Sequence, residues 1–188
     1  HTRYWRDWSS DVCSSDLSFV FDGTDDYATA DSVLTDSFFQ GQWTISFWIK
    51  FDTISTSGVV GQDRALLHHG TNNNNRGLHL CQRDSKIHFG LFGNDVSSSS
   101  TVSTDTWYNL VFTLNNSTGA KSILINGSLD NNHTGSAYIG TGSNARIGGE
   151  ILFGKNFDGN MVMMNAYNRA LTVSEIAQNY NALKGRYA

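Results

Sequence analysis

Three carboxylates crowd one short segment of the chain, Asp22-Gly23-Thr24-Asp25-Asp26. Calcium takes about six to eight oxygens from carboxylates, amides and backbone carbonyls, so this segment could supply part of such a shell. Asp158 would approach the same segment if the first and last strands pair. We therefore carry calcium as a candidate cofactor, with Asp22, Asp25, Asp26 and Asp158 as its candidate ligands. The competing interpretation is that Asp22 and Asp25 bond backbone N–H groups of a turn.

Amide, guanidinium and carboxylate side chains recur in segments predicted to be loops. Sugar sites combine such polar groups, which bond hydroxyls, with an aromatic ring that packs against the sugar face. The candidate ligand-binding residues are Asn73, Asn74, Arg76, Asn94, Asp95 and Asn144 for the polar part, and Tyr138 for the aromatic plate. The alternative is that each polar residue is a solvated loop tip.

The sequence gives little support for a glycosidase, which would cleave a sugar chain with a pair of carboxyl groups. Retaining glycosidases use two carboxyl groups about 5 Å apart, and the only glutamates are Glu150 and Glu175. Glu150 lies in a glycine-rich turn, and Glu175 is better explained as a helix cap. We therefore expect no catalytic residues and no enzyme activity.

Histidines offer a second route to catalysis or metal binding. A lyase could use His79 or His88 with a tyrosine, but half-buried histidines of a sheet explain this pair better. His68 and His69 are adjacent, and neighbouring residues of a strand face opposite ways. We therefore interpret them as a surface pair at a strand end, not as metal ligands.

Composition excludes two classes of partner. The net charge of −4 does not fit a nucleic-acid footprint, and no window approaches the roughly 18 apolar residues of a membrane span. A chain of 188 residues is long enough for one domain with a hydrophobic core.

The first 17 residues, HTRYWRDWSSDVCSSDL, resemble translated DNA. The codons of a common short-read sequencing adapter, interrupted by a sample index, reproduce residues 1–17 without a gap. Such segments are excluded from fold reasoning; the alternative is a genuine linker rich in serine and aspartate. We expect a non-native segment at 1–17, with few contacts to the rest, and one domain at 18–188. Cys13 falls in the first part, which leaves Cys81 as the single cysteine of the domain, so the cysteines do not indicate a redox compartment.

From residue 18 the sequence is typical of short strands separated by turns. The strongest strand, WTISFWIKF at 43–51, alternates between an apolar face and a mixed one. Other strands are predicted at 18–21, 65–68, 77–81, 86–92, 107–114, 121–126, 145–148 and 160–167. Asn126-Gly127 predicts a hairpin turn. The asparagine run 72–75 and the serine run 97–100 are expected to be surface loops.

One helix is predicted near the C-terminal end. Thr172 and Glu175 form a capping-box pattern, and apolar residues follow at helical spacing. Gly185 is expected to end the helix in a left-handed conformation. We expect this amphipathic helix to cover a sheet edge or rim.

Four segments resemble, in order, those of LamG-like, concanavalin A-like lectin/glucanase jelly-roll domains. They are SFVFDGTDDYATA (18–30), WTISFWIKF (43–51), DTWYNLVFTLNNSTGAKSILINGSLD (105–130) and IGGEILFGKNFDGNMVMMNAYNRALTVSEI (147–176). The resemblance spans 18–188 and implies an all-β sandwich of two antiparallel jelly-roll sheets with one short C-terminal helix. From NRALTVSEI onward the chain is also similar to modules of phage and viral structural proteins. It departs from many members after Gly159, where Asn160 and Met161 replace an acidic pair.

This fold carries lectins, adhesins, spacers and enzymes, so the fold alone does not give the function. The loop residues favour a non-catalytic recognition or adhesion module that binds a glycan or cell-surface polysaccharide. We expect it at the C-terminal end of a larger extracellular or virion-surface protein, whose other domains are possible partners. The alternatives are a structural virion or tail domain without a ligand and, third, a polysaccharide-degrading enzyme.

Overall fold

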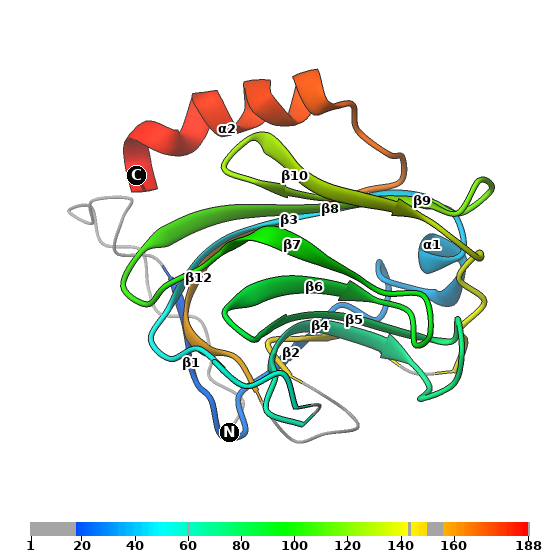
Figure 1. Ribbon diagram of the computed structural model, residues 1–188, viewed down its shortest axis with the longest axis horizontal. Helices are drawn as coiled ribbons and strands as arrows, with labels where there is room; N and C mark the ends of the chain where they lie inside the picture. Colours follow the sequence, from blue (N-terminus) through cyan, green and yellow to red (C-terminus); the bar gives the residue numbers. More distant parts are fainter. Residues whose placement is uncertain (1–17, 60, 143, 150–155, 188) are drawn as a thin grey trace.

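The computed structural model describes residues 18–59, 61–142, 144–149 and 156–187. The adapter-like segment 1–17 and Glu150 lie outside the described residues. Two antiparallel sheets of six strands each pack face to face, and a C-terminal helix lies over one of them (Figure 1). This arrangement confirms the predicted all-β jelly-roll sandwich.

The first sheet has the strand order β1-β12-β3-β8-β9-β10. These strands are β1 (Phe19–Asp22), β12 (Asp158–Tyr167), β3 (Gln42–Phe51), β8 (Trp107–Asn115), β9 (Ala120–Ile125) and β10 (Ser128–Thr134). β1 pairs with β12, which places Asp22 opposite Asp158. The predicted hairpin turn joins β9 to β10, and both Asn126 and Gly127 have positive φ, at 51° and 77°.

The second sheet has the order β2-β11-β4-β5-β6-β7. Its strands are β2 (Ala28–Thr29), β11 (Arg146–Ile147), β4 (Arg64–Gly70), β5 (Gly77–Arg83), β6 (Lys86–Gly90) and β7 (Val96–Thr101). The serine run therefore belongs to β7, and its prediction as a loop was wrong. Ladder hydrogen bonds come from the backbone, so a serine run can pair with β6 as well as an apolar one can.

β7 also meets β10, the edge strand of the first sheet. Asn131 Nδ2 donates to the backbone oxygen of Ser97 at 2.8 Å. The Asp130 carboxylate accepts from the backbone N–H of Ser99 at 2.5 Å and of Ser100 at 3.2 Å. These contacts join the two sheets along one edge, which we call the β7–β10 seam.

The core between the sheets is rich in aromatic rings. Trp43 packs on Phe89 with ring centroids 5.4 Å apart, and Phe89 contacts Phe112 edge-on at 5.8 Å. A short helix that the sequence analysis missed, α1 (Asp36–Phe39), closes one end of the core. Thr35 caps it, and fully buried Phe39 stacks on His69 at 4.4 Å.

The C-terminal helix α2 (Val173–Tyr187) begins with the predicted capping box. Thr172 N–H donates to Glu175 Oε2 at 2.8 Å, and Glu175 N–H donates to Thr172 Oγ1 at 3.3 Å. The helix continues past Gly185 to Tyr187, so the predicted glycine stop was wrong. Neither described helix combines the length and apolar character needed to cross a bilayer.

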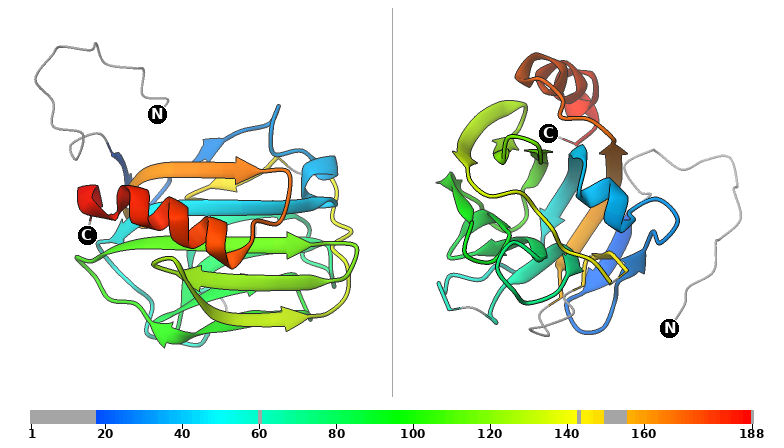
Figure 2. Two further views of the ribbon diagram at one scale, coloured as in Figure 1. Left: turned by 90° about the horizontal axis from the view of Figure 1, so that it is seen from above. Right: turned by 90° about the vertical axis from the view of Figure 1, so that its right-hand side faces the viewer.

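The helix lies over the outer face of the first sheet (Figure 2), not along an edge or rim as predicted. Trp48, on that face, stacks on Tyr180 with centroids 5.6 Å apart and ring planes 12° from parallel. Ile176 joins Val111 and Leu124 in a second small apolar cluster. Because β3 and β8 place large apolar side chains on the outer face, that face requires a cover.

Candidate functional site

Loops meet at the end of the sandwich that α1 closes, on the right in Figure 1. We call residues 71–76, 92–95 and 135–142 the loop rim. Asn75 N–H donates to the backbone oxygen of Phe92 at 3.1 Å, and Ile139 N–H donates to that of Asn75 at 2.8 Å. The asparagine run therefore lies between the other two loops. The fold brings six of the seven predicted ligand-binding residues into one region.

Tyr138 cannot serve as the predicted aromatic plate because its ring is only 1% exposed. Its Oη lies 2.8 Å from His69 Nδ1 and also donates to the His69 backbone oxygen at 2.9 Å. Burial raises the pKa of the Tyr138 phenol well above its usual range. The ring fills the end of the core, and the prediction for this residue was wrong.

Asn94 is also buried, and it holds the loops together. Its Nδ2 donates to the backbone oxygen of Ser136 at 2.8 Å. The Lys121 ammonium donates to the Asn94 backbone oxygen and lies 3.2 Å from Asn94 Oδ1. Lys121 is 1% exposed, and burial lowers its pKa to about 8. Asn94 therefore anchors the loop rim instead of facing a ligand, contrary to the prediction.

The other predicted residues of the loop rim are exposed. Asp95 accepts from the Leu91 N–H at 2.8 Å through Oδ1, and its carboxylate still faces solvent. Asn73 makes only a long contact with Thr71 Oγ1, at 3.5 Å. The side chains of Asn74 and Arg76 form no hydrogen bond with another described residue. Their polar atoms are therefore available to a ligand.

Asn144 lies outside the loop rim. Its Nδ2 donates to Asp31 Oδ2 at 3.0 Å, which ties it to the loop before α1. Gly142, the last residue of the loop rim, is held by α1 itself, because its N–H lies 3.3 Å from both carboxylate oxygens of Asp36. Asn144 is exposed, so it flanks the loop rim.

The acidic segment forms a compact turn beside β12. Carboxylate oxygens of Asp22, Asp25 and Asp26 lie within 4.8 Å of one another. Asp158 pairs opposite Asp22 as anticipated, and its Oδ2 accepts from Thr53 Oγ1 at 2.7 Å. Asp22 Oδ1 also accepts from the Thr24 N–H at 2.8 Å, so the turn bond of the competing interpretation is present. The donor set fits part of a calcium shell, and calcium binding here stays a prediction.

The histidine pair of β4 is buried, so its prediction as a surface pair was wrong. His69 points into the core, and His68 points outward beside His79 of β5. Burial lowers the pKa of His68 to about 3, and burial lowers that of His88 to about 4. These imidazoles are neutral at neutral pH. A lyase would pair His79 or His88 with a tyrosine such as Tyr108. The two histidines belong to the second sheet, whereas Tyr108 belongs to the first, where its Oη accepts from the Ser103 N–H at 3.0 Å.

A cavity of about 310 Å³, which the sequence did not predict, lies between α2 and the first sheet. Its apolar walls include Leu183, and its polar lining residues are Thr44, Ser46, Trp48, Asn109, Asn165, Tyr167 and Asn179. The alternation of β3 already placed Trp48 on the outer face. What the alternation could not supply was the position of α2 above it.

The family model of the concanavalin A-like lectin/glucanases superfamily matches residues 22–177. No curated protein matches the chain in sequence.

Solved structures similar to this one come from several bacteria. The CBM40 of the Ruminococcus gnavus IT-sialidase, bound to α2,3-sialyllactose, has a TM-score of 0.69 at 16% identity, over 88% of this chain and 97% of that one. A putative carbohydrate-binding protein from Bacteroides ovatus has a TM-score of 0.63 at 17% identity, over 83% and 45%. The binding domain of Paraclostridial Mosquitocidal Protein 1 has a TM-score of 0.62 at 20% identity, over 89% and 46%. At these identities the likeness shows the fold alone.

Proposed function

Because the chain belongs to the concanavalin A-like lectin/glucanases superfamily, we propose that it is a non-catalytic carbohydrate-binding module whose loop rim takes a glycan. The observation behind this proposal is that Asn74, Arg76 and Asp95 are exposed on loops that buried, hydrogen-bonded side chains hold in place. Those buried side chains are Asn94, Lys121 and Tyr138. Loops held in this way keep one conformation, so little ordering entropy is lost on binding. The similarity to a CBM40 bound to sialyllactose supports the same conclusion.

The exposed groups of the loop rim match sugar chemistry. Amides and carboxylates accept and donate hydrogen bonds to hydroxyls, and a guanidinium can pair with a carboxylate through two parallel bonds. Ile139, 47% exposed, offers the apolar contact that buried Tyr138 does not. Arg76 makes an acidic sugar a suitable ligand, so sialyllactose is the first glycan to test.

The proposal extends to the setting of the module. We place it in an extracellular or virion-surface protein, where glycans of a cell surface are within reach. Calcium at Asp22, Asp25, Asp26 and Asp158 would act there as a structural ion, since this turn joins β1 to the following strand.

The test is glycan binding by the whole chain, first on a glycan array and then by calorimetry with sialyllactose. Arg76→Ala should weaken binding about tenfold or more, because it removes a charge-assisted pair. Arg186→Ala is the matched control, since Arg186 is an exposed arginine on α2, away from the loop rim. Equal losses in both variants would refute the site.

Two other outcomes separate the remaining alternatives. A chain that binds no glycan above background would be a structural domain. Release of reducing ends from mixed polysaccharides would instead identify an enzyme.

A further inference from the structure

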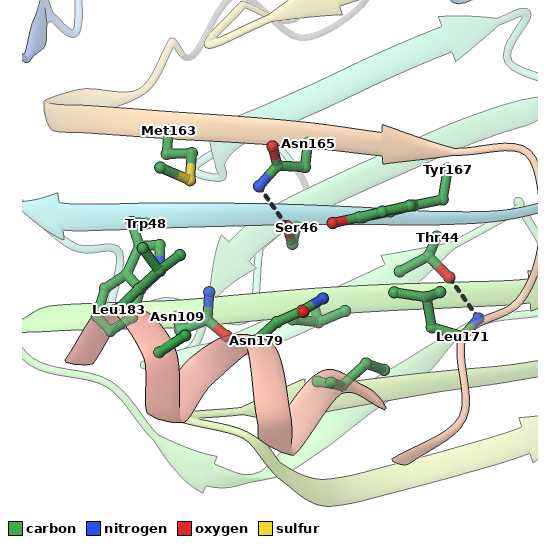
Figure 3. Close-up of a pocket in the computed structure, with 13 residues that line it drawn as sticks. Thr44, Ser46, Trp48, Asn109, Met163, Asn165, Tyr167, Leu171, Asn179 and Leu183 are labelled. Carbon is green, nitrogen blue, oxygen red and sulfur yellow. Dashed lines mark hydrogen bonds between the residues drawn. The ribbon is translucent and has the colours of Figure 1, made fainter. Parts of the chain in front are cut away.

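The cavity beneath α2 has the make-up of a ligand site. Its floor is the outer face of β3, β8 and β12, and its roof is the helix (Figure 3). Binding pockets for small molecules have volumes of about 300–1,000 Å³. The cavity of about 310 Å³ is therefore suited to a ligand the size of one sugar ring.

A buried donor lines this cavity without a partner. Trp48 is 1% exposed, and its Nε1 has no hydrogen-bond partner among the described residues. The indole is held in place by Tyr180, on which it stacks, and by Tyr187, whose ring centroid lies 5.0 Å away. A buried N–H without an acceptor is costly, and a ligand oxygen that displaced the side chains around it would satisfy it.

Asparagine amides supply further polar atoms, beside the hydroxyl groups of Thr44, Ser46 and Tyr167. Asn109 lies directly opposite Trp48 in the β3–β8 register, so the two side chains are neighbours on the outer face. Its Nδ2 donates to the Phe47 backbone oxygen at 3.3 Å, which leaves Oδ1 as an acceptor. Asn165 makes only a long contact with Ser46, at 3.5 Å, and Asn179 is exposed on α2 (Figure 3).

The walls define what kind of ligand these atoms can serve. The described residues that line the cavity include no acidic or basic side chain, so a charged ligand would lose its hydration without gaining a partner. Met163 and Leu183 provide apolar surface next to the indole. This lining therefore suits an uncharged ligand with a carbonyl oxygen, an N–H and a small apolar group close together.

We propose that this cavity binds an uncharged N-acetylhexosamine through its acetamido group. The carbonyl oxygen accepts from Trp48 Nε1, and the amide N–H donates to Asn109 Oδ1. The methyl group packs on Met163 and Leu183, while ring hydroxyls face Asn179. The site shares no residue with the loop rim, so it does not depend on the function proposed for that rim.

Nitrogen–proton correlation spectra of the labelled full chain test this assignment. The indole N–H signal of Trp48, identified by its loss in Trp48→Phe, should shift saturably with N-acetylglucosamine. Glucose, which lacks the acetamido group, should leave it in place. Sialyllactose should also leave it in place, because its carboxylate would meet no cation. A signal that N-acetylglucosamine does not move, or that glucose moves equally, would overturn the proposal.

Substitutions of exposed residues on α2 test the site without removing a buried side chain that the fold needs. Asn179→Ala should weaken N-acetylglucosamine binding about fivefold, because it removes hydrogen bonds at the open side. Asn181→Ala is the matched control, since Asn181 is also exposed on α2 but does not line the cavity. Equal affinity of the two variants would contradict the site. Arg76→Ala should leave this binding unchanged, which separates the cavity from the loop rim.

Discussion

Acid should destabilise this sandwich through the buried histidine of β4. His68 has no exposed surface, and its pKa is lowered to about 3. The main cause is burial, which penalises the imidazolium; the neighbouring His79, His69 and Arg146 act in the same direction. In the unfolded chain the same imidazole takes up a proton near its ordinary pKa of about 6.5.

The sign and size of the effect follow from these two values. Between about pH 6.5 and pH 3 the unfolded state binds more protons than the folded state, so the free energy of unfolding decreases as the pH falls. Each pH unit in this window costs about 1.4 kcal/mol. At about pH 4.5 the loss from His68 alone is therefore roughly 3 kcal/mol. Domains are stable by only about 5–15 kcal/mol, so this loss is large.

Urea denaturation, followed by tryptophan fluorescence at neutral pH and at about pH 4.5, measures the loss. In His68→Gln the difference between the two pH values should shrink by roughly 3 kcal/mol relative to the unmodified chain. His133→Gln, which alters an exposed histidine of β10, should retain the full difference. The reasoning is refuted if His68→Gln keeps that difference as well. A second measurement, the proton titration of the His68 ring by NMR, should show no midpoint above about pH 4.

Other predictions concern the acidic turn, the buried lysine and the hairpin. Calcium should raise the melting temperature relative to a chelated sample, and Asp25→Ala should abolish the rise; an unchanged melting temperature would argue against the site. Folded Lys121 loses its proton near pH 8 and the unfolded one near 10.5, so thermal stability should increase with pH across that window. Lys121→Met should remove that increase. Gly127→Ala should destabilise the protein by about 1 kcal/mol or more, since φ is 77° and a Cβ would lie 2.8 Å from Tyr180; calorimetry of the variant measures this loss.

The elements that could be predicted from the sequence are those whose structure depends on a local pattern of side chains and not on distant contacts. β3 was recognised because its alternation needs no knowledge of partners, and the hairpin at Asn126-Gly127 because both residues tolerate positive φ. The capping box of α2 was equally local. By contrast, α1 has only four residues, too few for a periodic pattern to be recognised.

Sites were harder to predict because they depend on which loops meet. The exposure of Asn74, Arg76 and Asp95 followed from their loop composition. The burial of Tyr138 and Asn94 did not, since it arises from contacts with His69 and with the distant Lys121. The cavity beneath α2 exists only because α2 lies over the first sheet, and no pattern within β3 predicts the position of that helix.

The β7–β10 seam also bears on how the protein behaves at high concentration. An open strand edge is a template on which the strand of another molecule can add. Asp130 occupies the backbone N–H groups of Ser99 and Ser100, and Asn131 occupies the backbone oxygen of Ser97. Those groups of β7 are therefore already bonded within the molecule. Along this side the sandwich therefore resists edge-to-edge aggregation, and the Asp130 carboxylate and the Asn131 amide contribute to that resistance.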